Sequence, residues 1–304
     1  MRIATIFLRH GTQKFPNSQA RMDEMFLQQM PEVQHETVIV DTMHPLGHLE
    51  RVSSVLTVLG GDNRFSEFSA ADVALSWIGD RIWSYDLVHL ATAAFHTLYV
   101  GYLERFDMRM LRAIVGKPAC LGHIDCYNES IRLLSYHSQH WLRTSFLFLP
   151  PAELKALASL VSFSDRSRIF SGNPEQPFRP DAPLSENYRR YIYDWLTGGD
   201  IGQGVTWHSG FTLTRETLPE FERKALAILN EHLLAIRLRA LGCRVVDTTW
   251  LWTQLSRGEE NDVNWTLGWR EQLATRAVDA LIVRGTPGQT AASSASAGAE
   301  NPVS

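Results

Sequence analysis

The chain has few cysteines and no excess of basic residues. Its 304 residues include only Cys120, Cys126 and Cys243, an odd number without a CxxC pair. This favours a reducing compartment over a disulfide scaffold. The net charge is −4 at pH 7. That value argues against nucleic acid as a partner, because nucleic-acid binders concentrate basic residues on their surface.

Long hydrophobic runs are also missing. No stretch approaches the roughly eighteen apolar residues that a membrane-spanning helix needs. Charged Arg9 and His10 follow residues 1–7 at once, without the apolar segment and cleavage site of a signal peptide. The expected location is therefore the cytoplasm, with peripheral contact at the inner face of the membrane left open.

Hydrophobic residues make up 44% of the chain, enough for one large or two modest domains. Short apolar strands alternate with helical patterns, which predicts an α/β fold with a mainly parallel sheet. Strands are predicted over 2–8, 36–41, 55–59, 85–91, 119–124, 144–149 and 245–248, and helices over 18–30, 69–78, 95–105, 151–161 and 218–241. Ser69 is the expected N-cap of its helix.

A composition change divides the chain. Residues 164–183 are rich in Ser, Pro, Gly, Asp and Arg, which is typical of a long loop or lid. We therefore expect one region over 1–162 and a second over 163–284. Residues 285–304 lack large apolar side chains and are expected to be a disordered tail.

The most informative feature is a hydrophobic strand that ends on an acid. The segment VIVD ends at Asp41, and the next predicted strand leads into Gly60, Gly61, Asp62 and Asn63 before a helix begins. Open α/β sheets bind ligands at the carboxyl ends of their strands. This order of residues therefore predicts a nucleotide pocket at that edge.

The order of these segments resembles that of GT-A glycosyltransferases, particularly the bacterial polysaccharide and rhamnan-synthesis type. The matching segments are VIVDT, GGDN, EFSAADVAL, YDLVHLATAAF, GHID and HSQHWLRTSFLFLP, and the likeness returns in KALAILNEHLLAIRLRALG. The resemblance implies a GT-A-like, Rossmann-like α/β region over 1–162 that holds a nucleotide diphosphosugar. It also implies an acceptor or lid region with a helical C-terminal part over 163–284.

The resemblance implies specific roles for the strand-end residues. Asp41 would hydrogen-bond the base or ribose, Gly60 and Gly61 would let the backbone approach the nucleotide, and Asp62 and Asn63 would orient it. The alternative for Asp41 is a turn acid that ends its strand, and for the glycines a plain turn. Both alternatives stay open.

The metal site of the resembling family is not evident. GT-A enzymes commonly hold Mn²⁺ or Mg²⁺ through an acidic pair after the fourth strand, where the metal neutralises the leaving diphosphate. Here the segment LATAAF, from Leu90 to Phe95, contains no acid. The metal could be held elsewhere, with Asp125 as a candidate ligand. Alternatively, cationic side chains such as Arg9 and Arg143, together with His123, stabilise the charge, or catalysis has been lost.

The segment GHIDCYNE carries the candidate catalytic acids. An inverting transfer needs a carboxylate that accepts the proton of the acceptor hydroxyl. Asp125 is the first candidate and Glu129 the second. The structural alternative is that Asp125 caps the following segment and that His123 is a packed core histidine.

Further residues are candidates for contact with the sugar or the acceptor. Ser138, Gln139 and Trp141 precede an apolar strand and are expected at the mouth of the sheet, with Trp141 suited to stacking on a sugar ring. His123 is placed with them. Glu67 would contact the donor sugar, or it simply precedes the helix start.

Two other functions fit parts of the sequence. The segment FLRHGT resembles the RHG box of the histidine phosphatase superfamily, in which His10 would accept a phosphoryl group and Arg9 would bind the phosphate. The chain could also be a non-catalytic subunit that binds nucleotide sugars. The main prediction is a glycosyltransferase of bacterial surface polysaccharide synthesis, which moves a sugar from a nucleotide donor to a glycan or lipid-linked acceptor.

Overall fold

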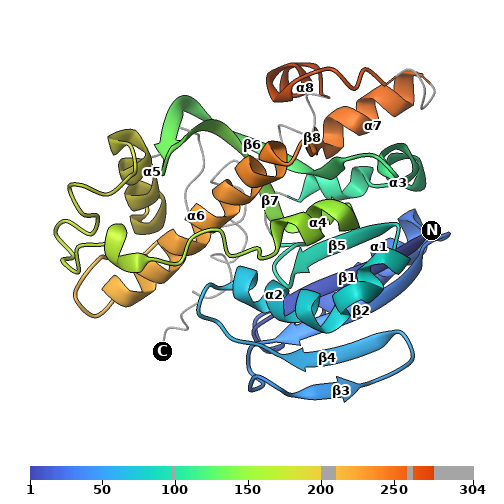
Figure 1. Cartoon of the computed structure of the whole chain (residues 1–304), viewed down its shortest axis with the longest axis horizontal. Helices are drawn as coiled ribbons and strands as arrows, with labels where there is room; N and C mark the ends of the chain where they lie inside the picture. The colour runs from blue at the N-terminus through green and yellow to red at the C-terminus, as the bar shows by residue number, and fades with distance from the viewer. Residues whose placement is uncertain (98–99, 200–209, 259–262, 277–304) are drawn as a thin grey trace, which may run out of the picture.

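The computed structural model describes residues 1–97, 100–199, 210–258 and 263–276, and it has an α/β fold built on one eight-stranded mixed sheet (Figure 1). The strands are β1 (Arg2–Arg9), β2 (Gln34–Asp41), β3 (Leu49–Arg51), β4 (Leu56–Gly60), β5 (Leu87–Thr92), β6 (Ala119–Leu133), β7 (Tyr136–Leu149) and β8 (Arg244–Asp247). The helices are α1 (Ser18–Gln29), α2 (Glu67–Ile78), α3 (Met108–Ile114), α4 (Pro151–Leu157), α5 (Glu186–Thr197), α6 (Leu218–Ala240), α7 (Thr248–Arg257) and α8 (Trp269–Thr275), with 3-10 helices η1 (Gly79–Ser84), η2 (Gly101–Arg105) and η3 (Arg166–Arg168).

The strand order is β3-β4-β2-β1-β5-β7-β6-β8. Strands β4, β2, β1 and β5 are parallel neighbours, and β8 runs parallel to β6. Strand β7 is antiparallel to both β5 and β6, and β3 is antiparallel to β4. The chain leaves β1 toward β2 on one side and later returns to β5 on the other. This reversal of strand order is the switch point at which open α/β sheets bind ligands.

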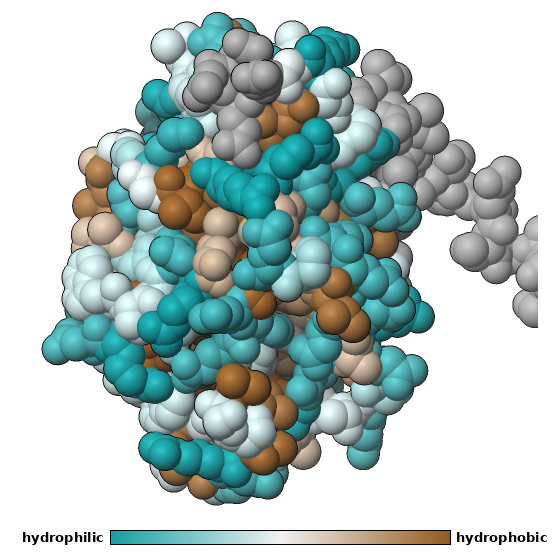
Figure 2. All heavy atoms as spheres, turned by 90° about the vertical axis from the view of Figure 1, so that its right-hand side faces the viewer, coloured by the Kyte–Doolittle hydropathy of each residue, from teal (hydrophilic) through white to brown (hydrophobic). Residues whose placement is uncertain are grey.

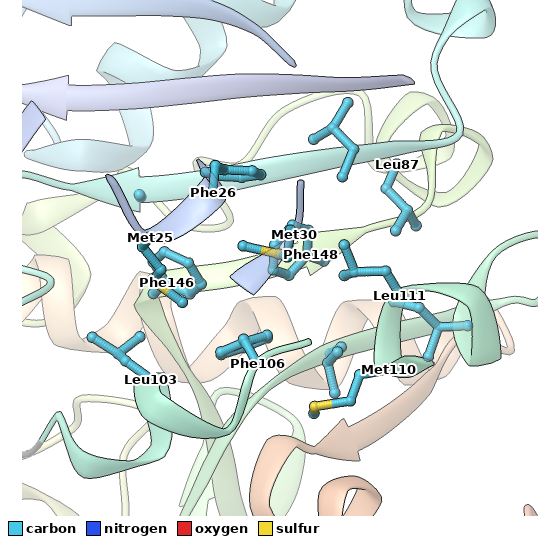
Figure 3. Close-up of a cluster of buried hydrophobic side chains, with 14 of the residues drawn as sticks. Met25, Phe26, Met30, Leu87, Leu103, Phe106, Met110, Leu111, Phe146 and Phe148 are labelled. Atoms are coloured by element: carbon cyan, nitrogen blue, oxygen red, sulfur yellow. The ribbon is translucent and has the colours of Figure 1, made fainter. Parts of the chain in front are cut away.

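Helices cover both faces of the sheet. On one face, α1, η2, α3 and α7 pack on β1, β5 and β7 around the aromatic pair Phe146 and Phe148 (Figure 3). Figure 3 shows Met25, Phe26 and Phe106 gathered around these two rings. On the other face, α2, α4 and the C-terminal half of α6 enclose a second cluster of buried residues. The result is the three-layer arrangement expected of a Rossmann-like α/β fold.

A third hydrophobic cluster lies beyond the sheet. Strands β6 and β7 extend past it as a long hairpin, and their outer halves pack against α5 and the N-terminal half of α6 (Figure 1). Tyr127 and Trp141 from the hairpin share this cluster with Phe163, Tyr188 and residues of α6. The expected division at residues 162 and 163 therefore passes through one continuous core, because β6 and β7 serve both regions.

Several element boundaries differ from those expected. Helix α2 begins at Glu67 after the N-cap Ser66, so Ser69 lies inside its first turn and not at the cap. The helix expected over 95–105 is wrong, since the described residues of that range form turns and the short η2. Strands β6 and β7 are far longer than expected. Short strand β3 was not expected at all, and the predicted tail at 285–304 lies outside the described residues.

Among the described residues, no helix is long and apolar enough to cross a membrane. On the face seen in Figure 2, hydrophobic residues form separate small groups among hydrophilic ones. The exposed large apolar side chains are concentrated between β2 and β4, at Met43, Leu46, Leu49, Val52 and Val55. Nothing tests peripheral membrane contact, which stays a prediction.

Candidate functional site

A cavity of about 900 Å³ opens at the carboxyl ends of β1 and β5, at the switch point of the sheet. Its sheet-side wall comes from the ends of β1, β2 and β5, and from β6 and β7. Its helix-side wall comes from the start of α2 and from α5 and α6. The volume suits a ligand of nucleotide-sugar size, because small-molecule sites commonly measure about 300–1,000 Å³.

Arg9 and Asp41 form an ion pair at the ends of β1 and β2. Arg9 Nε lies 2.7 Å from Asp41 Oδ2, while Asp41 Oδ1 accepts hydrogen bonds from the backbone N–H groups of Gly11 and Met43. Burial acts to raise the pKa of Asp41, but these hydrogen bonds and the Arg9 charge outweigh it and lower the pKa. Arg9 lines the cavity, whereas the buried Asp41 fixes Arg9 and the turn after β2.

Gly60 at the end of β4 and Gly61 directly after it permit close packing of the chain on itself. A Cβ atom at Gly60 would lie 1.8 Å from the Pro45 carbonyl oxygen, and one at Gly61 would lie 2.6 Å from Val40 Cγ1. Neither glycine is among the described residues that line the cavity. Their role in this structure is to seat the loop after β2 against the end of β4.

The segment between β4 and α2 reaches the cavity at three residues. Asn63, Ser66 and Glu67 line it, while Asp62 turns back to bind the side chain of Arg64. Ser66 has a positive φ of 52°, which is strained for a residue with a side chain. Such strain is concentrated at functional sites, where the surrounding structure holds it in place.

Asp125 lies within the long strand β6 and contacts Arg143 and His123. Its Oδ2 is 2.5 Å from Arg143 Nε on β7, and its Oδ1 is 3.4 Å from His123 Nε2. Burial alone would raise the pKa of Asp125, but the Arg143 charge and the His123 contact lower it well below the usual range. The Arg143 guanidinium thus favours the ionised form of Asp125.

Glu231 projects from the middle of α6 into the same cavity. Its Oε1 accepts hydrogen bonds from the backbone N–H of Thr144 (2.9 Å) and from Thr144 Oγ1 (3.1 Å). Burial raises the pKa of Glu231 to about 7, and the negative charge of Glu67 acts in the same direction. Burial likewise raises the pKa of Glu67. The cavity therefore contains one carboxyl group with a lowered pKa, Asp125, and two with raised pKa values, Glu67 and Glu231.

Aromatic side chains form another part of the wall. Trp141, Tyr191 and Trp195 line the cavity, and the Tyr191 and Trp195 rings are stacked with centroids 6.2 Å apart. His232 lies at the same wall, where its Nδ1 is 2.6 Å from Tyr188 Oη. These flat surfaces can stack on a base or a sugar ring.

Cationic side chains surround the rest of the opening. The lining contains Arg9, Lys14, Arg143, Arg223 and Lys224 against three acids. Arg223 makes two hydrogen bonds to Glu220 and a third to Ser66 Oγ, so its guanidinium is held in place beside the strained turn. A phosphate or diphosphate is the ligand that such a set of donors recognises best.

Several predicted site residues lie elsewhere. Glu129 contacts Asn187 on the exposed part of the hairpin. Buried Ser138 donates its hydroxyl to the His140 carbonyl oxygen, and Gln139 binds main-chain carbonyls of the neighbouring strand. None of these three predicted residues lines the described part of the cavity.

His123 is a packed residue behind Asp125. Its ring stacks on Tyr102, with centroids 4.8 Å apart, and it is not among the described lining residues. Burial, together with the Arg143 charge, lowers the pKa of His123. A neutral imidazole that orients Asp125 agrees with the alternative of a packed core histidine.

The described residues do not fit a protein-held divalent metal. No group of three or more His, Cys, Asp or Glu side chains that could hold a metal occurs among them. The end of β5 presents Thr92, Ala93 and Ala94 to the cavity, and Asp125, the other candidate ligand, is already bound by Arg143.

Comparison with protein-family models, with curated proteins and with solved structures found no significant match. The site therefore has to be interpreted from its own chemistry. Glu231 and the α5 aromatics were not predicted as site residues. The available signal for Glu231 was the polar triplet Asn230, Glu231 and His232, which interrupts an otherwise apolar stretch of α6.

Proposed function

We propose that the protein transfers a sugar from a nucleotide diphosphosugar to a hydroxyl acceptor. The observation that carries this proposal is a single cavity at the switch point in which five cationic side chains, four Phe, Tyr or Trp rings and three carboxyl groups converge. A nucleotide sugar needs those three kinds of partner. Cations bind its diphosphate, aromatic rings stack on its base or sugar, and carboxyl groups bind its hydroxyls.

The cations also suit the departure of the nucleoside diphosphate from the sugar. When the sugar leaves, negative charge develops on the diphosphate, and fixed positive groups stabilise that charge most strongly in an enclosed site. Arg9 and Arg143 are both held by carboxylates at 2.7 Å and 2.5 Å, so little reorganisation is needed when the donor binds. In this proposal Asp41 positions Arg9, and Asp125 positions Arg143.

The acceptor enters from the side of α5 and α6. Trp141 and Tyr191 face the cavity there and give a surface suited to a sugar ring. A glycan or a lipid-linked sugar, as used in bacterial surface polysaccharide synthesis, is the acceptor class that the sequence resemblance implies. The aromatic wall supports a carbohydrate acceptor.

A thermal-shift screen tests donor binding. The wild-type chain is mixed with UDP-, GDP- and dTDP-linked sugars, and separately with phosphate and vanadate, with and without Mn²⁺. A ligand present at a hundred times its dissociation constant stabilises by about 2.7 kcal/mol. We expect one class of nucleotide sugar to raise the melting temperature and phosphate alone to leave it unchanged.

A matched pair of variants locates the binding site. Lys14→Ala removes a cation from the cavity and should weaken the stabilisation by the donor. Lys155→Ala removes a surface cation that pairs with Asp80 on η1, so it should leave that stabilisation unchanged. Equal stabilisation of both variants would mean that the donor does not bind in this cavity.

The screen also separates the other two functions. His10 lines the cavity, and its Nδ1 lies 2.7 Å from Thr42 Oγ1, a contact that limits rotation of the ring. Stabilisation by vanadate and not by nucleotide sugars, with loss of phosphatase activity in His10→Ala, would favour that function. Donor binding without any turnover would favour a non-catalytic subunit.

A further inference from the structure

Glu231 and Asp125 are acidic side chains in one cavity, but their surroundings differ. Both oxygens of Asp125 are in contact with cationic or imidazole nitrogens, Oδ2 with Arg143 and Oδ1 with His123. Protonating Asp125 would break its pairing with Arg143. An acid held in this way is a poor proton acceptor, because its ionised form is already stabilised.

Glu231 is held differently. Its Oε1 accepts two hydrogen bonds from Thr144, which fix the carboxyl group against β7. These donors are a backbone N–H and a hydroxyl, and neither carries a charge. Glu231 lines the same cavity as Trp141 and Tyr191, the residues at which the acceptor is proposed to bind.

We propose that Glu231 is the catalytic base of the proposed transfer and that Asp125 is a positioning residue for Arg143. This inference rests on the proposed function. The acceptor O–H bond breaks as its proton passes to the Glu231 carboxylate, and the acceptor oxygen forms a bond to the anomeric carbon. The bond from that carbon to the diphosphate oxygen breaks, and its electron pair leaves with the diphosphate. No electrons are gained or lost overall.

The environment of Glu231 supports this assignment. Charged and titratable groups face it from every neighbouring element: Glu67 on α2, Tyr102 on η2, Asp125 and Tyr127 on β6, Arg143 on β7, and Tyr188 and Tyr191 on α5. Burial outweighs the Thr144 hydrogen bonds and raises the pKa of Glu231 to about 7. A base with a pKa near the working pH combines a useful ionised fraction with a strong affinity for the proton.

A single displacement of this kind has a stereochemical consequence. The acceptor oxygen attacks the face of the anomeric carbon opposite to the departing diphosphate. The product must therefore have the inverted anomeric configuration. The sequence alone left this outcome undecided.

The test uses the full chain and the nucleotide sugar that stabilises it in the screen, with release of nucleoside diphosphate as the rate signal. Glu231→Gln keeps an oxygen that can accept both Thr144 hydrogen bonds, so the fold should be preserved. Glu186→Gln, on the exposed first turn of α5, is the matched control. Asp125→Asn is the second comparison, because it removes the rival carboxylate.

We expect Glu231→Gln to bind the donor like the wild type but to lose about a hundred- to ten-thousandfold in kcat. The wild-type rate should rise with pH through a limb near pH 7, and this limb should disappear in Glu231→Gln. Asp125→Asn should bind the donor more weakly yet retain the limb. Glu186→Gln should match the wild type, and NMR of the product should show inversion.

Other outcomes overturn the assignment. Donor binding and turnover that both persist in Glu231→Gln, a pH limb lost in Asp125→Asn instead, or retention of configuration each exclude Glu231 as the base while leaving glycosyl transfer intact. Two results with the wild type would contradict the proposed function itself. In the first, no nucleotide sugar stabilises the chain, and in the second, the chain binds a donor without turnover. Either result removes the proposed function and the base assignment together.

Discussion

The sheet-side and helix-side walls of the cavity contain carboxyl groups in opposite electrostatic states. On the sheet side, Asp41 and Asp125 are each paired with an arginine, and both have lowered pKa values. At the helix-side opening, Glu231 on α6 and Glu67 at the start of α2 have raised pKa values because burial dominates. Acids of similar intrinsic strength thus serve different purposes in one cavity.

In the proposed mechanism, this difference in pKa separates positioning from proton transfer. Paired acids keep their charge and hold arginines in fixed places, which stabilises the fold and prepares the cavity for an anion. Acids with raised pKa values cost stability, because the folded chain must carry an unfavourable charge at neutral pH. Variants on the two walls should therefore change stability in opposite directions.

The largest effect is expected on the sheet-side wall. Asp125→Ala removes the ion-pair partner of Arg143 from a largely enclosed position and should lower the free energy of unfolding by about 3–4 kcal/mol. Urea denaturation at pH 7 measures it. Asp181→Ala, in an exposed pair with Arg179, serves as the control and should change little. Equal losses in both variants would show that the Asp125 pair does not differ from a surface pair.

The next effect concerns the packing beneath the same wall. Gly60→Ala places a Cβ atom against the Pro45 carbonyl oxygen, so the loop after β2 has to move. We expect a loss of about 2–3 kcal/mol, because overpacked positions commonly cost that much. Thermal unfolding followed by circular dichroism tests it. An unchanged melting temperature would mean that this loop adapts freely and that Gly60 has no packing role.

On the helix-side wall, Glu231→Gln should stabilise the protein. The folded-state pKa of Glu231 is raised to about 7, above the value of 4.5 in the unfolded chain. The wild type therefore loses stability as pH rises from 4.5 to 7, and the neutral variant does not. We expect the variant to gain about 2–3 kcal/mol at pH 8 and little at pH 4.5. Urea denaturation of both proteins at the two pH values measures this difference.

The pH dependence is the essential part of that experiment. A gain that is the same at pH 4.5 and pH 8 would reflect packing and not the charge of Glu231. A loss at pH 8 would contradict the raised pKa. In either case the contrast between the two walls would not hold.

The smallest effect concerns His232, which lies next to Glu231 on α6. Burial lowers the pKa of His232 to about 3, below the 6.5 of the unfolded chain. The free energy of unfolding therefore has its full value with respect to His232 above pH 6.5, and it falls as the pH decreases toward 3. Between pH 6.5 and 5.5, the wild type should therefore lose about 1 kcal/mol more unfolding free energy than His232→Gln does. Equal slopes of unfolding free energy against pH in the two proteins would contradict a neutral buried His232.

Much of the fold could be predicted from the sequence. The alternation of apolar strands and helices indicated an α/β sheet, and the long helix near 218–241 is confirmed as α6. The lengths of β6 and β7 could not be predicted, because their outer halves contain polar runs at residues 128–130 and 137–140. These halves instead pack on α5 and α6. Ser69 was assigned as a cap since it is a good N-cap residue, but Ser66 occupies that position in a strained conformation.

The site was predictable only where residues follow parallel strands. Arg9, Asn63 and Glu67 line the cavity at the ends of β1 and β4 and at the start of α2, as strand-end reasoning indicates. Glu231 lies 87 residues farther along the chain than its hydrogen-bond partner Thr144. Only the docking of α6 on β7 brings the two residues together. The raised pKa of Glu231 results from that burial, which no local sequence pattern records.

The shared hairpin of β6 and β7 limits how the chain can be divided. Its inner half completes the main sheet, and its outer half supplies part of the third hydrophobic cluster. A fragment that ends before α5 would retain both strands but leave Tyr127 and Trp141 without their apolar covering. We therefore expect evolution to keep the two regions together. Recombination that replaced α5 and α6 would also have to replace the outer halves of β6 and β7, which pack against them.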